Sequence, residues 1–436
     1  MRVLLAVHAF PPSSTGGVEV YTLRLGRALQ ALGHEVQVLA AVHDLAAAEH
    51  DVRRRVHEGV DVVEIVNTRR AGTLASTYRN VHVDALARRL LEDFHPDVLH
   101  VQHLVNLSAG IVDEARRAGV PVVLTLHDHW LRCPRDGLRF RADLVLCETV
   151  DHAVCARCLA QGPQVAPPGE GRLLGLAQRL GLGRTLHRVH DAFPRATESM
   201  LSLVRRVSPR EDLSAALDDR VRVLASVLPG VDRVIAPTAF VAERARESGL
   251  PMPEMQVQPL GATAHPARPR VSEPRRRVAF VGTLAPHKGV HVLIDAFRGL
   301  PDADLRLDLH GSLTVAPAYV HDLRRRAEGD PRIHFHGPFP AAEQPRIFAS
   351  LDVLVLLEAL AEGKLVIASR TGGIPEVVGA NGRLVAPGDV AALREALDDV
   401  TSGRSLAGGG PAPSIPTAEE GAIQLVALYE SLRPTR

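Results

Sequence analysis

The chain has few aromatic residues, almost no net charge and no long apolar run. Aromatic side chains make up 3% of its 436 residues, which argues against the stacking platforms that bind single-stranded nucleic acid. A formal net charge of +1 provides no general attraction to nucleic acid either. No uninterrupted apolar run is long enough to cross a bilayer, so a membrane-spanning protein is not expected.

Lysine is scarce as well, because Lys288 and Lys364 are the only lysines among 51 basic residues. The N-terminus lacks a basic segment followed by a longer apolar one, so we expect no signal peptide and a cytoplasmic location. In that compartment, four cysteines are expected to be thiols or metal ligands rather than disulfides. The composition is otherwise typical of a folded protein, and the length predicts two α/β domains.

Short apolar runs alternate with helical patterns along the chain. A helix is predicted at Val18–Leu32, and the strands of the first half are predicted at Val3–Val7, Glu35–Ala40, Val60–Ile65, Val98–Val101, Val120–Leu126 and Val231–Ala236. The stretch Pro266–Pro274 is typical of a linker. Beyond it, strands are predicted at Arg277–Val281, Leu305–His310, Arg332–His336, Asp352–Leu357 and Leu365–Ala368, with a final helix at Ala418–Leu432. This alternation predicts parallel sheets with helices on both faces.

Several segments lie where a predicted strand ends and a helix begins, which is where parallel sheets bind ligands. Lys288 is in such a segment, Val281–Gly289, where backbone amides and a cation favour a phosphate. Glu358 opens a later helical stretch, where its carboxylate suits ribose hydroxyls or simply the helix dipole. Gly372 and Gly373 permit close approach to a ligand, or form an ordinary turn.

The first half has two comparable places. Gly16 and Gly17 lie in the loop after the first strand, and this loop lacks the G-x-G-x-x-G pattern of dinucleotide-binding dehydrogenases. His127, Asp128 and His129 directly follow the strand predicted at Val120–Leu126. For both places a structural role and a functional role are about equally indicated.

All cysteines of the chain fall in one window. They are Cys133, Cys147, Cys155 and Cys158, and the last two form a C-x-x-C pair. Four thiolates are the ligand set of a structural zinc site, whereas the alternative is a group of unconnected core thiols. The spacing is looser than the paired C-x-x-C of a zinc ribbon, but no other cysteine occurs in the chain, so we favour a metal ion that is structural rather than catalytic.

The ordered set of motifs resembles the family 4 retaining glycosyltransferases. The matching pieces are the Gly-Gly loop, LTLHDHW, VIAPTAFVAERARESG, VAFVGTLAPHKGVHVLIDAF, IHFHGPF, EALAEGKLVIASRTGGIPEVV and NGRLVAPGD. The resemblance implies the GT-B fold, with two Rossmann-like domains that face each other across a cleft. It also implies that some relatives carry a similar cysteine-rich insertion after the HD strand.

The resemblance implies a division of the chain. Residues 1–265 would form the acceptor-side domain, with a cysteine-rich segment at 133–158 and a basic helical insertion at 160–228. Residues 275–412 would bind the nucleotide sugar, and the helix in 413–436 would cross back to the first domain.

The resemblance also implies roles for individual residues. Lys288 would hold the diphosphate, Glu358 the ribose, and His127 would lie near the reacting sugar, without a catalytic metal. The other positions implied to contact the donor are Gly16, Gly17, Gly282, Thr283, Gly337, Pro338, Gly372 and Gly373. The donor would be a UDP- or GDP-sugar rather than an ADP-sugar.

Two departures from the family pattern concern the donor site. Thr283 stands where the family has arginine, which removes one charge that would face phosphate. The family pattern of Glu, seven residues and Glu keeps only its second member, Glu358, and the loop that precedes it is missing. The favoured hypothesis is an active retaining transferase that builds a polysaccharide, a glycolipid or a glycosylated metabolite. The alternative is a catalytically impaired GT-B protein that binds a nucleotide sugar or a partner; a GT-B sugar epimerase fits the motifs less well.

A basic segment lies between the two halves. Arg172–Arg210 contains eight arginines and two acidic residues, interleaved with leucines. Such a segment can dock on an anionic membrane, which would place the protein at its inner face, or it can be a solvated surface.

Overall fold

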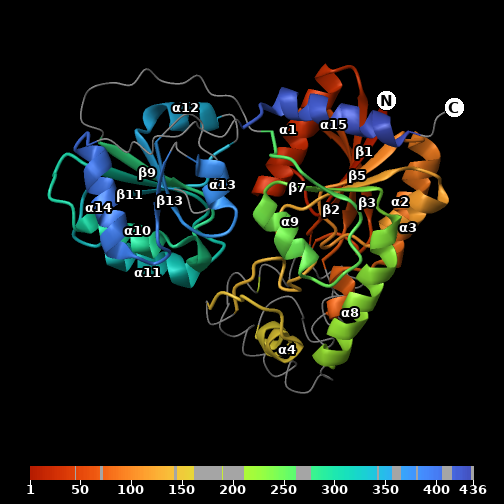
Figure 1. The fold of residues 1–436 in the computed structure, drawn as a ribbon, viewed down its shortest axis with the longest axis horizontal. Helices are drawn as coiled ribbons and strands as arrows, with labels where there is room; N and C mark the ends of the chain where they lie inside the picture. Colours follow the sequence, from red (N-terminus) through yellow and green to blue (C-terminus); the bar gives the residue numbers. More distant parts are fainter. Residues whose placement is uncertain are drawn as a thin grey trace. The chain divides into compact units, whose positions relative to one another are not determined.

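The computed structural model describes residues 1–44, 46–68, 72–141, 145–161, 189, 211–261, 276–340, 343–355, 365–379, 382–404 and 415–433. It divides into two compact units (Figure 1). One unit comprises Met1–Gly261 together with Ala418–Arg436, and the other comprises Ala262–Thr417. In the described part of the chain, no helix is long and apolar enough to cross a membrane.

The described part of the first unit contains an eight-stranded sheet in the order β3-β4-β2-β1-β5-β6-β7-β8. The strands are β1 (Arg2–Val7), β2 (Glu35–Val42), β3 (Val52–His57), β4 (Val60–Val66), β5 (Val98–Val101), β6 (Val122–Thr125), β7 (Arg233–Ala236) and β8 (Met255–Val257). The neighbours pair in parallel except β3, which runs antiparallel to β4. β1 lies between β2 and β5: strands β2 to β4 extend the sheet on one side of β1, and strands β5 to β8 extend it on the other side.

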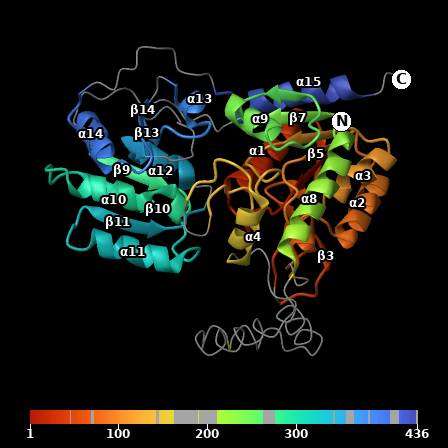
Figure 2. The same cartoon turned by 60° about the horizontal axis from the view of Figure 1, so that its bottom comes forward.

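Helices cover both faces of this sheet (Figure 2). On one face lie α1 (Gly17–Ala31) and α15 (Ala418–Leu432). The other face carries α2 (Val81–Phe94), α3 (Gly110–Arg117) and α8 (Leu213–Val227). The other helices described in this unit are α4 (His152–Ala160), which packs on α8, and α9 (Ala239–Arg246), which packs on β7 and β8. Short 3₁₀ turns are described at η1 (Leu74–Thr77) and η2 (Leu228–Gly230).

The C-terminal helix α15 is fastened to the first unit by a buried tyrosine. Ala422, Leu425 and Tyr429 recur at helical spacing and are buried against α1 and the central strands. The Tyr429 hydroxyl lies 2.5 Å from Nδ1 of His100, which is fully buried on β5. The other ring nitrogen of His100 lies 2.7 Å from Thr125 Oγ1, so this imidazole connects the terminal helix with two strands of the sheet.

The second unit contains a six-stranded sheet in the order β11-β10-β9-β12-β13-β14, as described. Its strands, all parallel, are β9 (Arg277–Val281), β10 (Arg306–His310), β11 (Ile333–Gly337), β12 (Val353–Val355), β13 (Leu365–Ser369) and β14 (Gly382–Val385). The helices are α10 (Val290–Arg298), α11 (Pro317–Ala327), α12 (Gln344–Ser350), α13 (Ile374–Val378) and α14 (Val390–Thr401), with the 3₁₀ turn η3 (Pro286–Lys288). The order is that of the doubly wound nucleotide-binding sheet.

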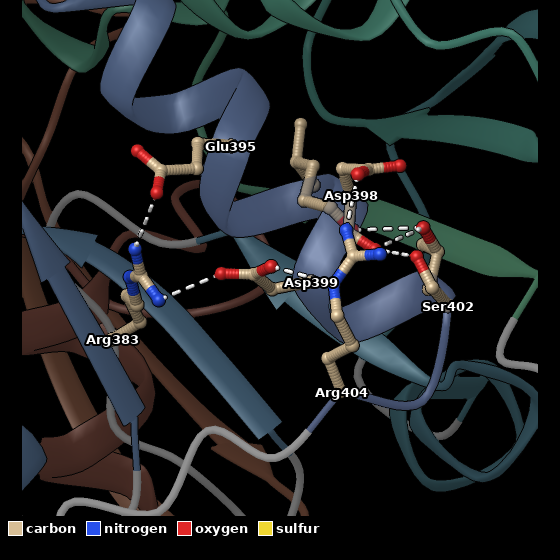
Figure 3. A network of polar contacts seen from close by, with 8 residues as sticks. Arg383, Glu395, Asp398, Asp399, Ser402 and Arg404 are labelled. Atoms are coloured by element: carbon tan, nitrogen blue, oxygen red, sulfur yellow. Dashed lines mark hydrogen bonds and ion pairs between the residues drawn. The ribbon is translucent and has the colours of Figure 1, made fainter.

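Ion pairs attach α14 to the edge strand β14 (Figure 3). Arg383 on β14 lies 2.9 Å from one oxygen of Asp399, and Arg404 lies 2.9 Å from the other oxygen. Arg404 also pairs with Asp398, and Arg383 lies 3.7 Å from Glu395. Because a network of charges holds its geometry better than a single exposed pair, this cluster helps to set the angle of α14 on the sheet.

The structure contains three strands that the periodicity of the sequence does not predict. β3 carries three consecutive arginines and is largely exposed at the sheet edge, so it lacks an apolar pattern. β8 and β14 are short edge strands of three and four residues. Edge strands bury one side at most, which leaves little hydrophobic signal to detect.

Candidate active site

The second unit has a topological switch point at its first strand. β9 lies between β10 and β12, so the carboxyl ends of β9 and β12 lie side by side. The loop after β9 runs from Gly282 through η3 into α10 and contains Lys288. In open α/β sheets, ligands bind at the carboxyl ends of the strands at such a point.

Lys288 is half-buried at the end of η3, directly before α10. Burial lowers the pKa of its ammonium to about 8, which still leaves the group mostly charged near neutral pH. The backbone N–H of Gly282 donates to the His310 carbonyl at 2.9 Å, which ties the loop to the next strand. A partly desolvated cation at a strand-to-helix junction is suited to a phosphate.

Gly337 and Pro338 are the predicted contacts for the base; Gly337 is the last residue of β11, and Pro338 follows it at the same edge of the sheet. The Gly337 carbonyl accepts a hydrogen bond of 2.9 Å from Gly311 N–H. His336 stacks on His310 with ring centroids 4.5 Å apart, and the edge of Phe339 approaches His310 at 5.7 Å. The sequence motif IHFHGPF contains His336 and Phe339, but the sequence predicts no role for them. In the structure these rings form a partly exposed aromatic surface beside Gly337.

The other predicted donor contacts are only partly described. Gly372 and Gly373 follow β13, and α13 begins at the next residue, so both glycines lie at the same edge of the sheet as Lys288. Thr283 is exposed in the loop after β9. Glu358 lies outside the described residues, as do residues 356–364 that connect β12 to β13.

Polar side chains gather at the switch point of the first unit as well. The strands β1, β5 and β6 are neighbours in the sheet, so their carboxyl ends lie side by side. Polar side chains that follow these three strands contact one another. These residues are His8 and Glu19 near β1, Gln102 and His103 after β5, and His127 and Asp128 after β6. The sequence motif contained only the last two.

Gly16 and Gly17 form the start of α1, and Gly16 is shaped by a buried carboxylate. A Cβ on Gly16 would lie 2.5 Å from Oε2 of Glu19, so no larger residue fits there without movement. Glu19 accepts a hydrogen bond of 2.6 Å from Ser14 and lies 3.4 Å from His8. Burial would raise its pKa, but the contacts with His8 and Ser14 prevail and lower it to about 2. The space beside Gly17 is open.

Asp128 is a fixed, ionised carboxylate. The N–H of Val105 donates to His103 Nδ1 at 3.0 Å, so His103 carries its proton on Nε2 and donates it to Asp128 Oδ2 at 3.0 Å. The backbone N–H of Trp130 donates to Oδ1 at 2.7 Å. Against the effect of burial, these contacts hold the Asp128 pKa below its usual range. The side chain keeps 33% of its surface exposed, so it can still accept hydrogen bonds from a ligand.

His127 is neutral in this cluster. Burial and the neighbouring His103 lower its pKa to about 3. Its Nε2 lies 2.9 Å from Gln102 Oε1, and because an amide oxygen only accepts, His127 donates there and keeps Nδ1 as an acceptor. The amide nitrogen of Gln102 and Nδ1 of His8 are buried without a hydrogen-bond partner among the described residues. Unsatisfied polar atoms of this kind favour a site that binds hydroxyl groups.

The four cysteines lie in the segment 133–158, which follows His127 and Asp128 in the chain. All four are partly buried free thiols. Burial raises the pKa of Cys155 to about 11, and the neighbouring thiols Cys133 and Cys147 add to the shift, so the sulfurs influence one another. In the described ranges, no three metal-binding side chains already stand in an arrangement that could hold an ion. The zinc site therefore stays a prediction.

Two family models match the chain, Glycosyltransferase Family 4 at residues 15–157 and Glycosyl transferases group 1 at residues 275–402. The D-inositol 3-phosphate glycosyltransferase of Corynebacterium efficiens is 24% identical over 425 residues, covering 91% of this chain and 86% of that protein. Anabaena HepE, solved with UDP and glucose, matches with a TM-score of 0.59 at 16% identity over 99% of both chains. Sucrose-phosphate synthase from Thermosynechococcus elongatus matches with a TM-score of 0.61 at 16% identity, covering 99% of this chain and 98% of that one. One family model falls on each unit.

Proposed function

Because the chain is a glycosyltransferase with the GT-B fold, we propose that it transfers a sugar from a nucleotide-sugar donor to a polysaccharide, glycolipid or metabolite acceptor, with retention of anomeric configuration. The observation that carries the donor assignment is the position of Lys288 at the switch point of a doubly wound sheet. The donor is a UDP- or GDP-sugar.

In this proposal the second unit holds the nucleotide. Lys288 faces the diphosphate, and Gly282 and Thr283 form the loop beside it. Gly372 and Gly373 permit close approach of the donor to the backbone before α13. When the bond between the anomeric carbon and the diphosphate breaks, negative charge grows on the departing phosphate oxygen. The Lys288 ammonium stabilises that charge without a catalytic metal. The base lies near Gly337, where the stack of His310 and His336 offers an aromatic surface.

The polar cluster of the first unit binds hydroxyl groups of the sugars. His127 is neutral and offers an acceptor nitrogen, and Asp128 offers a carboxylate that His103 and a backbone amide hold in place. Gln102 supplies an unpaired amide donor. Acceptors and donors set at fixed positions distinguish a sugar or polyol from an apolar acceptor.

We also propose that Cys133, Cys147, Cys155 and Cys158 bind one structural zinc ion. Thiolates are preferred zinc ligands, and no other cysteine occurs in the chain. The ion would support the fold of the first unit, since the energy of metal binding is folding energy.

A second candidate is supported by the missing donor loop. β12 ends at Val355 and β13 begins at Leu365, and residues 356–364 contain only the second of the two family glutamates, Glu358. A protein without the first carboxylate would bind the nucleotide sugar but turn it over poorly or not at all.

A thermal-shift screen against UDP-, GDP- and ADP-sugars, followed by calorimetry with the best of them, tests the donor assignment. We expect one nucleotide to raise the melting temperature and to bind with one-to-one stoichiometry. The proposal fails if none of them binds to the wild-type protein.

A further inference from the structure

Two buried arginines of the first unit lack a carboxylate partner. Arg139 is 8% exposed and Arg220 is 3% exposed, and among the described residues neither forms an ion pair. Removing a guanidinium from water is costly unless a negative charge compensates for it. Most arginines of the chain that the structure describes lie on the surface, and many of them pair with acidic residues, as Arg27 does with Glu58.

The hydrogen bonds of both arginines go to the backbone around the cysteines. Arg220 donates to the carbonyls of Trp130 and Leu131, and its guanidinium carbon lies 4.9 Å from the centre of the Trp130 ring. Arg139 donates through Nε to the Cys147 carbonyl at 3.0 Å, and through a terminal nitrogen to the same carbonyl. Carbonyl oxygens carry only partial charge, so neither guanidinium has an anion at ion-pair distance among the described residues; the Asp128 carboxylate acts on Arg220 from farther away.

Cys133 acts electrostatically on both arginines, and a thiol becomes anionic when it binds a metal. Cys155 and Arg220 line one pocket together with Pro134, which follows Cys133. Burial lowers the pKa of Arg220 to about 10, while Cys133 and Cys155 act in the opposite direction. Burial lowers the pKa of Arg139 as well, while Cys133 and Cys147 act in the opposite direction. The outer-shell partners of a metal site orient its ligands and tune its affinity.

We infer that Arg139 and Arg220 are the built-in counter-charges of a tetrathiolate metal centre formed by the four cysteines. A divalent zinc ion with four thiolates carries a net charge of about −2, and two guanidiniums neutralise it. The inference rests on the proposed zinc site and names the residues that set its affinity.

The same centre supports the polar cluster at the carboxyl end of β6. The N–H of Cys133 donates to the His129 carbonyl at 2.7 Å, and Arg220 holds the carbonyls of the next two residues. The Gly137 backbone lies against Asp128, since a Cβ there would be 2.5 Å from the Asp128 carboxyl carbon. Residues 128–133 are thus fixed from one side by the strand and from the other by the cysteine segment.

Cobalt binding to the full-length protein tests the inference. The protein is stripped with chelator and titrated with Co²⁺, which reports thiolate ligation through its charge-transfer absorption, and Zn²⁺ affinity is measured by competition. Wild type is expected to bind one ion per chain. Arg139→Met and Arg220→Met are each expected to weaken binding by about 10- to 100-fold, the usual effect of an outer-shell partner. Arg157→Met is the matched control, because Arg157 lies between Cys155 and Cys158 but is exposed.

The outcomes separate the inference from the proposal beneath it. If wild type binds no cobalt and all four thiols react freely, the zinc site is wrong and the counter-charge role falls with it. If wild type binds cobalt and the methionine variants bind it equally well, only the counter-charge role is wrong. Should both methionine variants fail to fold, Arg139→Lys and Arg220→Lys, which keep the charge, must bind cobalt within a few-fold of wild type; weaker binding would also overturn the inference.

Discussion

Replacement of Lys288 removes a cation from the loop after β9, at the switch point of the second sheet. Its ammonium would make a charge-assisted hydrogen bond to the diphosphate, and the loss of such a bond costs about 1.5–3 kcal/mol. That free energy corresponds to an affinity for nucleoside diphosphate about 10- to 150-fold weaker in Lys288→Ala. Isothermal titration calorimetry measures the change, and Arg325→Ala on the exposed side of α11 is the control.

The pH dependence of nucleotide affinity tests the role of Lys288 independently. Burial lowers the Lys288 pKa to about 8, and the diphosphate binds the protonated ammonium. As the pH rises through this value the free protein loses the proton, so affinity should fall roughly tenfold between pH 7 and pH 9. Lys288→Arg keeps its charge over this range and should flatten the profile. Unchanged affinity in Lys288→Ala, or a flat wild-type profile, would refute the reasoning.

Three further predictions concern the first unit and the basic segment. Asp128→Asn should slow transfer by about tenfold or more while nucleotide affinity stays the same, because a charged acceptor for a hydroxyl is lost in the other unit; unchanged turnover would contradict this. Tyr429→Phe should lower the free energy of unfolding by about 1–3 kcal/mol, since a polar atom of the buried His100–Tyr429 pair loses its partner. Denaturant titration checks it, with Tyr319→Phe at a half-buried position expected to cost less. The segment Arg172–Arg210, of which the structure describes only residue 189, should bind vesicles rich in acidic lipid at low salt, with about 1 kcal/mol per arginine. Vesicle sedimentation that does not change when the arginines are replaced would rule out membrane docking.

The buried strands of both sheets follow directly from the sequence. Val98–Val101 and Arg277–Val281 have the predicted bounds, and the other predicted strands differ by a few residues at their ends. A parallel strand is apolar on both faces and is bounded by loops, which makes it easy to locate. The C-terminal helix Ala418–Leu432 also has its predicted bounds, because its apolar residues recur at helical spacing.

The candidate site was only partly predictable. His127 and Asp128 stand out because they follow a strand within a known motif, whereas His103 and Gln102 follow β5 in the same way without any motif. The rule that placed Lys288, a polar residue at the carboxyl end of a parallel strand, would have found them. Glu19 could not be found in this way, since its contact with His8 depends on how the loop folds back over α1.

The arginines beside the cysteines show a different limit. Arg139 and Arg220 are 81 positions apart, and neither differs in the sequence from the many surface arginines. Arg220 lies on α8, which packs on α4 of the cysteine segment, and both arginines are buried in the folded protein. Cys133 acts electrostatically on both of them. Burial without an ion pair depends on tertiary structure, so no local pattern predicts it.

The most direct test of the central claim is to follow donor consumption by NMR. The wild-type protein is incubated with UDP-, GDP- and ADP-sugars and a panel of sugar and polyol acceptors, and the anomeric signals are recorded. An active retaining transferase is expected to consume a UDP- or GDP-sugar and to form a product with the anomeric configuration of the donor, and Lys288→Ala should abolish most of this turnover. A nucleotide that binds while no donor is consumed would favour the impaired binding protein, and a product of inverted configuration would contradict the proposed mechanism.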